Sequence, residues 1–336
     1  MKVLIVGGTG LLGSEGARVL CARGHEVVSL ALPGLPEGFE APPGMQLHFG
    51  SYLDMADEAL LDLMAGCEGF VFAAGVDERV EVPKPAYQTY HRFNIAPLER
   101  LLRLAKQAGI RHAVVLGSYF SHFAGLHPDW QLTRWHPYIK SRIDQEDLAL
   151  GFQGPDFDVS LLQLPYIFGA QPGRKPVWVF LVDIIRSMPL ATFYPKGGTT
   201  MVTARQVGQA IAGAVESSRG ARLWPIGWDN MTWKSMFGIM HRHLGMPRRK
   251  VVTVPTFLFR LSAWLIRYRQ RRRGIEGGLD LVRFADTMSR ELYIDKALGS
   301  LPLGVTDDDI DAAIGDSMRQ SLAAGEKAGM IEMKGD

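Results

Sequence analysis

Short apolar runs and amphipathic segments alternate along the first half of the chain. Apolar runs predict buried strands at residues 3–6, 25–30, 45–49, 69–75, 112–116 and 159–164. Segments whose apolar residues recur with helical spacing lie between these strands, at residues 11–23, 57–64, 94–107 and 138–150. In the last of these helices we expect the acids to face solvent at least in part: Asp144, Glu146 and Asp147. Strands that alternate with helices predict an α/β fold, a Rossmann-type, doubly wound parallel sheet with helices on both faces.

The character of the chain changes after residue 170. We predict a dinucleotide-binding domain over residues 1–170 and a smaller, mixed substrate-binding region over residues 171–336, with the crossing at 171–176. The second region carries predicted helices near 178–188 and at 204–217. We expect the part near 204–227 to return to the main sheet.

The first predicted strand ends at three spaced glycines, Gly7, Gly10 and Gly13, and a helix follows. In a nucleotide-binding βαβ unit such glycines make a tight turn, admit a pyrophosphate and pack the helix closely against the strand. The N-terminus of the helix then offers free N–H groups and a positive dipole end to the phosphates. A tight turn without a ligand is the alternative. A predicted strand precedes the turn, a helix follows it and a second strand follows the helix, and this order favours a dinucleotide site.

Composition excludes several classes of protein. The 336 residues are 47% hydrophobic and 21% charged, with a formal net charge of +2, which is typical of a globular protein and indicates no nucleic-acid partner. Cys21 and Cys67 are too few for a disulfide framework, and neither group of histidines has other ligands at metal-binding spacing. We therefore predict no metal site. The first strand begins at Lys2, and no apolar run has the length of a membrane span, so we expect a cytoplasmic protein.

Several phrases in the chain resemble the extended short-chain dehydrogenase/reductases, which include NAD-dependent epimerases, dehydratases and 3β-hydroxysteroid dehydrogenases. They are VGGTGLLG at the start, FAAG after the fourth strand, PYIKSR and LPYIFG. The resemblance implies a bound NAD or NADP. The residues that it assigns to the cofactor are Gly7, Thr9, Gly10, Leu11, Leu12, Leu32, Ser51, Tyr52, Ala73, Ala74, Gly75, Asn94, Tyr138, Arg142, Pro165 and Ile167.

The family's catalytic Tyr lies four residues before a Lys, and here that pair reads Tyr138 and Arg142. A spacing of four places both on one helix face. The resemblance implies that Tyr138 exchanges a proton with the substrate oxygen while the nicotinamide exchanges a hydride with carbon. Arg142 supplies a cation for the phenolate, but it cannot release a proton as Lys can. The family's Ser or Thr aligns with Tyr119, so Ser118, Ser121 or the Tyr119 hydroxyl takes its role, and we favour Ser118.

The end of the second strand bears on the choice of cofactor. NAD-binding units usually carry an acid there, and NADP-binding units have an Arg nearby. This chain has Ala31 and Leu32, and Ser51 replaces the family's usual Asp at the adenine edge. The missing acid removes repulsion against a 2′-phosphate and favours NADP over NAD.

Aromatic and apolar residues of the second region predict a pocket for a hydrophobic ketone or alcohol, although a plain core would look the same. They are Trp178, Phe180, Leu181, Met188, Phe193, Tyr194, Trp224, Trp228 and Trp233. The predicted function is that of an NAD(P)-dependent oxidoreductase that interconverts a carbonyl and a secondary alcohol on a small molecule. Two alternatives stay open. One is an epimerase or dehydratase that retains its nucleotide, and the other is a non-catalytic dinucleotide sensor.

Residues 257–273 join an apolar face to a cluster of arginines. The pattern fits a weak contact with an anionic membrane surface. It also fits a helix that covers the substrate pocket with its arginines in water, which is the interpretation that we favour. The helices near Asn94 and Tyr138 are candidates for a homodimer interface.

Overall fold

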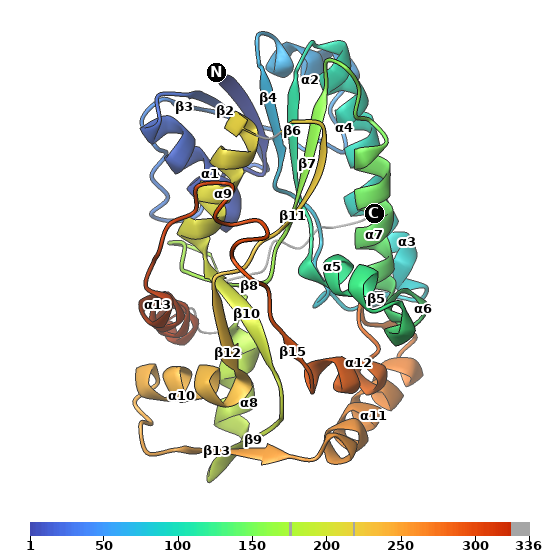
Figure 1. Ribbon diagram of the computed structural model, residues 1–336, viewed down its shortest axis with the longest axis vertical. Coiled ribbons are helices and arrows are strands. Elements are labelled where there is room, and N and C mark those ends of the chain that lie inside the picture. Colours follow the sequence, from blue (N-terminus) through green and yellow to red (C-terminus); the bar gives the residue numbers. More distant parts are fainter. Residues whose placement is uncertain (175–176, 218, 324–336) are drawn as a thin grey trace.

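The computed structural model describes residues 1–174, 177–217 and 219–323. Its centre is a seven-stranded parallel sheet in the order β11-β7-β6-β4-β1-β2-β3 (Figure 1). The strands are β1 (Lys2–Val6), β2 (Glu26–Ala31), β3 (Met45–Phe49), β4 (Gly69–Phe72), β6 (His112–Leu116), β7 (Asp158–Gln163) and β11 (Ala221–Pro225). The strand order reverses direction between β1 and β4, and ligands of doubly wound sheets bind at such a switch point. The predicted α/β fold is confirmed.

Helices cover both faces of this sheet (Figure 1). Val3 and Ile5 of β1 point into the core beneath α1 and α9, whereas Leu4 and Val6 point into the core beneath α2 and α4. A strand buried on both faces reads as a continuous apolar run, which is why β1 shows no alternation. The helices on the two faces are α1 (Leu11–Ala22) with α9 (Ala204–Ser217), and α2 (Asp57–Met64), α4 (Ala96–Gln107) and α7 (Pro137–Leu150).

The rest of the chain forms a second lobe below the carboxyl ends of the strands (Figure 1). Its core is an aromatic cluster that includes Tyr119, Trp178 and Trp233. The lobe's strands are β5 (Val82–Pro83), β8 (Tyr166–Phe168), β9 (Ala191–Pro195), β10 (Gly198–Thr203), β12 (Asp229–Thr232), β13 (Lys250–Val254), β14 (Ile275–Glu276) and β15 (Glu291–Leu292). The remaining helices are α3 (Ala86–Tyr90), η1 (His91–Ile95), α5 (Tyr119–Leu126), η2 (Pro128–Trp130), α6 (Leu132–Trp135), α8 (Val179–Ser187), α10 (Trp233–His243), α11 (Thr256–Arg272), α12 (Leu281–Met288) and α13 (Ile310–Ala323).

Two predicted element boundaries differ from the structure by more than one residue. The strand expected over 69–75 ends at Phe72, and the helix expected from Asn94 begins at Ala96 after the π-helical turn η1. Residues 221–225 form β11, which pairs in parallel with β7. The predicted crossing includes residues 175–176, which lie outside the described residues, and the division at residue 170 stays a prediction.

Glu146 corrects the expectation that the acids of α7 face solvent. Its side chain is 5% exposed, because it faces β7 and α5 rather than water. Ser121 Oγ donates a short hydrogen bond to its carboxylate, and Gln163 Nε2 donates another at 3.1 Å. Burial raises the pKa of Glu146 to about 7. Charge alone therefore did not indicate which side of α7 is exposed.

The raised pKa of Glu146 makes folding stability depend on pH. Between its ordinary pKa of 4.5 and the folded value, the folded state binds more protons than the unfolded state, so the free energy of unfolding falls as pH rises. Glu146→Gln keeps an acceptor for Ser121 and cannot ionise. We expect the free energy of unfolding of this variant to fall less than the wild type's between about pH 5 and about pH 7.5, by at most about 3 kcal/mol, and its melting temperature to fall less accordingly. Asp147→Asn, on the exposed side of α7, is the control, and parallel curves for the wild type and Glu146→Gln would contradict the prediction.

Candidate active site

The glycine-rich turn connects β1 to α1 at the switch point of the sheet. Gly7 has a φ of 91°, and a Cβ there would lie 2.6 Å from the carbonyl oxygen of Ala73, just after β4. A Cβ at Gly13 would lie 2.3 Å from the carbonyl oxygen of Gly7. Gly10 is different, because a Cβ there meets only that same oxygen, at 3.3 Å. Gly7 and Gly13 shape the turn, whereas Gly10 leaves room beside the uncapped N-terminus of α1, where N–H groups can bind an anion.

Two polar residues that the sequence analysis missed fold back over this turn. Gln171 Nε2 donates a hydrogen bond to the carbonyl oxygen of Thr9 at 2.8 Å, and Arg174 Nη2 lies 3.4 Å from Thr9 Oγ1. Arg174 Nε and Gln171 Oε1 are buried without a hydrogen-bond partner. Burial lowers the pKa of Arg174. An anion at the turn would satisfy this cation, and the arrangement fits a dinucleotide phosphate.

Leu32, Ser51 and Tyr52 lie beyond the ends of β2 and β3, and none of them carries a carboxylate. Ser51 Oγ accepts a hydrogen bond from Leu53 N at 3.3 Å. Tyr52 packs edge-on against Phe72, with ring centroids 5.8 Å apart, and burial raises its pKa to about 12. Its buried hydroxyl has no hydrogen-bond partner. The roles of these three residues in cofactor binding stay predictions.

Asn94 holds the loop that follows β4. Its Oδ1 accepts a hydrogen bond from Val76 N at 2.7 Å, and its Nδ2 donates one to Val76 O at 2.9 Å. A Cβ at Gly75 would lie 2.6 Å from Asn94 Oδ1, so this loop must carry a glycine there. Both polar atoms of the Asn94 side chain are hydrogen-bonded to the backbone of Val76, and these bonds hold the end of the loop that contains residues 73–75. A π-helical turn often marks a functional site, and here it presents Asn94 to the loop.

Tyr138 and Arg142 lie on one face of α7, as their spacing predicts. The Arg142 Cζ lies 5.1 Å from the centroid of the Tyr138 ring, and the residues are 7% and 4% exposed, respectively. Arg142 Nη1 donates to Gln145 Oε1 at 2.7 Å, and Gln145 Nε2 donates to Asn94 O at 2.9 Å. These bonds fix the guanidinium, whose buried Nε keeps an unused hydrogen for a ligand. Burial raises the pKa of Tyr138, and the Arg142 cation opposes that shift.

Three hydroxyls near the end of β6 were candidates for the substrate's hydrogen-bond partner. The Tyr119 hydroxyl lies 3.0 Å from Thr199 Oγ1, and Ser121 Oγ is bound within the Glu146 network. Ser118 is the N-cap of α5, and its Oγ has only a 3.4 Å bond from Phe120 N. Of the three, Ser118 has the least engaged hydroxyl, and its catalytic role stays a prediction.

A charged triplet beside Tyr138 also escaped the sequence analysis. Arg79 Nε donates to Asp77 Oδ1 at 2.9 Å, and the Arg79 guanidinium lies 5.8 Å from the centroid of Trp178. The negative charges of Glu78 and Asp77 raise the pKa of Tyr138, and burial raises the pKa of Glu78 itself. The sequence signal that could have identified Asp77 and Glu78 is their place in the loop after β4, because loops at the carboxyl ends of parallel strands border the ligand site of this fold.

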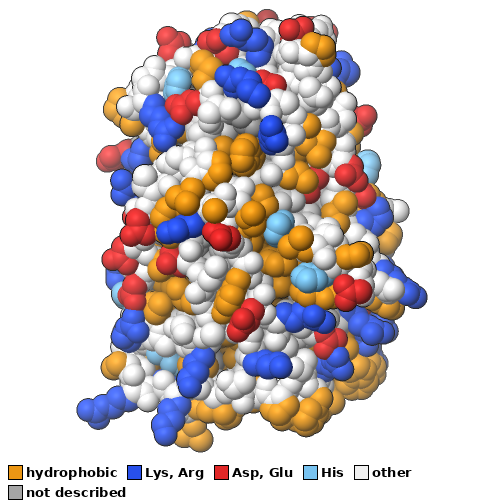
Figure 2. Space-filling view, in the orientation of Figure 1, with side chains coloured by type: hydrophobic (Ala, Val, Ile, Leu, Met, Phe, Trp, Pro, Cys, Tyr) orange, Lys and Arg blue, Asp and Glu red, His pale blue; other side chains and the backbone are white. Residues whose placement is uncertain are grey.

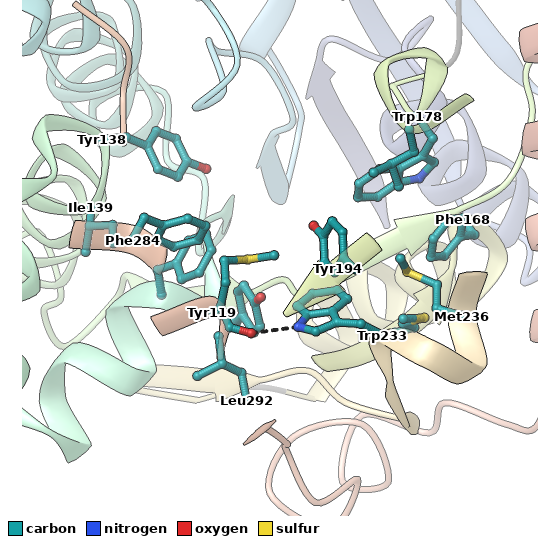
Figure 3. Packing of buried hydrophobic residues seen from close by; sticks show 14 of the residues in the cluster. Tyr119, Tyr138, Ile139, Phe168, Trp178, Tyr194, Trp233, Met236, Phe284 and Leu292 are labelled. Atoms are coloured by element: carbon teal, nitrogen blue, oxygen red, sulfur yellow. Dashed lines mark hydrogen bonds between the residues drawn. The ribbon is translucent and has the colours of Figure 1, made fainter. Parts of the chain in front are cut away.

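An aromatic wall lies across from Tyr138. Tyr166 stacks on Trp178 with ring centroids 4.9 Å apart, and Tyr194 packs edge-on against Trp233 at 5.7 Å. Figure 3 shows the Tyr138 hydroxyl directed toward the middle of the view, with Tyr194 and Trp178 on the opposite side. Pro165 is buried and Ile167 half-buried where β7 leads into β8, and the Ile167 carbonyl accepts a hydrogen bond from Trp178 Nε1 at 2.7 Å. This part of the molecule is therefore mostly apolar.

Comparisons with known proteins agree with the fold. The model of the NAD dependent epimerase/dehydratase family matches residues 3–187. Among solved structures, gox2253 aligns with a TM-score of 0.72 at 19% identity, covering 96% of this chain and 98% of that one. MoeE5 in complex with UDP-glucuronic acid and NAD aligns at 0.65 and 17%, covering 96% and 100%. WbmH from Bordetella bronchiseptica, in complex with NAD+, aligns at 0.67 and 15%, covering 96% and 99%. A search of curated proteins gave no match.

Proposed function

The chain belongs to the NAD-dependent epimerase/dehydratase family, and on that premise we propose that it is an NAD(P)-dependent oxidoreductase that interconverts a carbonyl and a secondary alcohol. One observation carries the proposal. A buried Tyr138 lies against the Arg142 cation at the carboxyl end of β6, where Arg142 Nη1 reaches Leu116 O at 3.5 Å. When bound, the nicotinamide would supply or accept the hydride.

Tyr138 acts as the proton donor in the direction of reduction. Its pKa is raised above the ordinary value of 10.0, so the phenol stays protonated at neutral pH and can donate to a carbonyl oxygen as negative charge develops there. Arg142 stabilises that oxygen and the phenolate left behind, and it keeps its own proton throughout. We propose Ser118 as the second hydrogen-bond donor to the substrate oxygen. The raised pKa of Tyr138 makes oxidation of the alcohol slower than reduction of the ketone at neutral pH, because the phenol must lose its proton before it can accept one from the alcohol.

The cofactor that we propose is a nicotinamide dinucleotide, with NADP preferred over NAD. The turn at Gly7–Gly10, Thr9 and the backbone of Leu11 and Leu12 would hold the pyrophosphate, and Arg174 would add a positive charge. The absence of a carboxylate at Leu32 and Ser51 supports NADP. The structural neighbours MoeE5 and WbmH hold NAD, so the preference depends on these residues of this chain.

We propose an apolar, uncharged ketone or alcohol as the substrate. The stacked rings of Tyr166 and Trp178 offer apolar surface, and Asp77 is already paired with Arg79. The aromatic wall therefore supports a ring-containing or long-chain compound over a nucleotide sugar.

An epimerase or dehydratase is the second candidate. UDP-glucuronic acid 4-epimerase from Bacillus cereus, solved with UDP-glucuronic acid and NAD, shares the fold at 12% identity. Glu78 favours this reading from within the chain, because a carboxyl of raised pKa beside Tyr138 is a suitable general acid for a leaving hydroxyl. Such an enzyme would recycle its nucleotide and show no net oxidation of it.

A substrate screen separates the two candidates. The purified protein is incubated with NADPH or NADH and a panel of alicyclic, aromatic and long-chain ketones, and the loss of reduced nicotinamide is followed by absorbance. In parallel it is incubated with NAD+ and nucleotide sugars, and the products are separated by chromatography. Turnover with apolar ketones supports the oxidoreductase. Conversion of a nucleotide sugar without net loss of reduced nicotinamide supports the epimerase or dehydratase instead, and cofactor binding without any turnover would refute both.

A further inference from the structure

Helix α11 presents an apolar face to solvent at the lower end of the molecule. The exposed residues Phe257, Leu261 and Tyr268 recur with helical spacing, and Phe257 and Leu261 are 66% and 60% exposed. The full exposed apolar set of α11 is Phe257, Leu258, Leu261, Trp264, Leu265, Ile266 and Tyr268. A water-exposed helix normally carries polar residues there, so this patch indicates an interaction surface.

The opposite side of α11 is already packed against the protein. Ala263 is buried, and Phe259 lies 5.8 Å from Tyr194, measured between ring centroids. Arg267 Nη1 pairs with Asp280 Oδ2 at 3.0 Å, and Arg260 forms an ion pair with Asp286. The apolar face is therefore the outer face of a docked helix. Because the inner face reaches the aromatic wall at Tyr194, the alternative of a helix over the substrate pocket stays a prediction.

The apolar face ends in a cluster of positive charge. Arg269, Arg271, Arg272 and Arg273 follow it, and within the described part of the chain no carboxylate forms an ion pair with any of these four. The neighbouring sheet of β9 and β13 adds exposed Phe193. Figure 2 shows hydrophobic and basic side chains gathered along this lower edge.

We propose that α11 binds the surface of an anionic lipid bilayer, with its apolar face in the headgroup region and its C-terminal arginines on lipid phosphates. Apolar side chains beside arginines are the composition of interfacial helices. Trp264 and Tyr268, stacked at 5.7 Å, are residue types that favour the membrane interface. None of the helices in the described ranges is long and apolar enough to cross a membrane.

Charge complementarity favours lipid over a second copy of the chain. Residues 256–273 contain six arginines and no Asp or Glu, so two copies joined through α11 would bring no carboxylate to these arginines from that segment. An anionic bilayer supplies one negative charge per lipid. The proposal does not depend on the chemistry of the active site.

The test is co-sedimentation of the full chain with phosphatidylcholine vesicles, with and without phosphatidylglycerol. We expect binding only when phosphatidylglycerol is present and weaker binding as salt is raised. Leu261→Glu or Leu265→Glu should lower the partition coefficient about tenfold or more. Arg271→Gln with Arg272→Gln should lower it by roughly fivefold per arginine.

Leu298→Glu is the matched control, because Leu298 is 52% exposed and lies outside α11. Circular dichroism of each variant checks the fold without reference to activity. No binding to anionic vesicles at low salt would overturn the proposal, as would binding that ignores both lipid charge and the arginine substitutions. Sedimentation equilibrium tests whether the face instead binds a second copy of the chain. A wild-type dimer that becomes a monomer in the Leu261→Glu variant would overturn the proposal.

Discussion

Replacing Tyr138 with Phe is expected to lower kcat by about 10²- to 10⁴-fold, because the substitution removes one hydroxyl and with it the proposed proton donor. The ring keeps its place, since Phe preserves its edge-on packing against Tyr90, at 5.5 Å between centroids, and its contact with Arg142. Affinity for the dinucleotide should stay close to that of the wild type. The assay is steady-state turnover of the best ketone from the screen, with cofactor binding measured in parallel.

Tyr90→Phe is the control for this substitution. Its hydroxyl lies 3.4 Å from the carbonyl oxygen of Asp77 and has no proposed part in proton transfer. We expect this variant to keep most of the wild-type kcat. Full activity in Tyr138→Phe would remove Tyr138 from the mechanism, and an equal loss in both variants would indicate damage to packing rather than to chemistry.

The second large effect is expected at Gly10, where Val should weaken dinucleotide binding by at least about 100-fold. Gly10 has φ −80° and ψ 165°, which Val adopts without strain, and a Cβ meets only the Gly7 carbonyl oxygen, at 3.3 Å. The fold should therefore survive. The added isopropyl group fills the space through which a phosphate approaches the backbone.

Gly238→Val is the matched control, because a Cβ at that position in α10 meets, among the described residues, nothing within 4 Å beyond its chain neighbours and the nearby backbone of its own helix. Both variants should keep cooperative thermal unfolding, and only Gly10→Val should lose the cofactor, as measured by quenching of protein fluorescence. Wild-type affinity in a folded Gly10→Val variant would mean that the glycine-rich turn does not hold the phosphates.

The sheet and the glycine turn could be predicted because local sequence determines them. The strand Lys2–Val6 is buried on both faces and appears as an unbroken apolar run, and Gly7 occupies a backbone conformation that few other residues tolerate. The pairing of Tyr138 with Arg142 follows from helical spacing alone. These features needed no knowledge of distant parts of the chain.

The remaining features depend on tertiary contacts. Arg174 reaches Thr9 across 165 positions, and the burial of Glu146 depends on Gln163 and Ser121, which come from other elements. Residue type suggested a solvated Glu146, and the sequence pattern of α11 did not indicate which of its sides packs against the protein. In both cases the packing of neighbouring elements, which the local pattern does not encode, decided which side is exposed.

A side-by-side fluorescence titration of the purified protein with NADPH and with NADH tests directly whether the glycine-rich turn binds a nicotinamide cofactor. We expect saturable binding of both, with the lower Kd for NADPH, because neither Leu32 nor Ser51 carries a carboxylate that would repel a 2′-phosphate. A lower Kd for NADH would overturn the cofactor preference and leave the dinucleotide site standing. Failure of both to bind would contradict the central claim that the turn from Gly7 to Gly13 serves a nicotinamide cofactor.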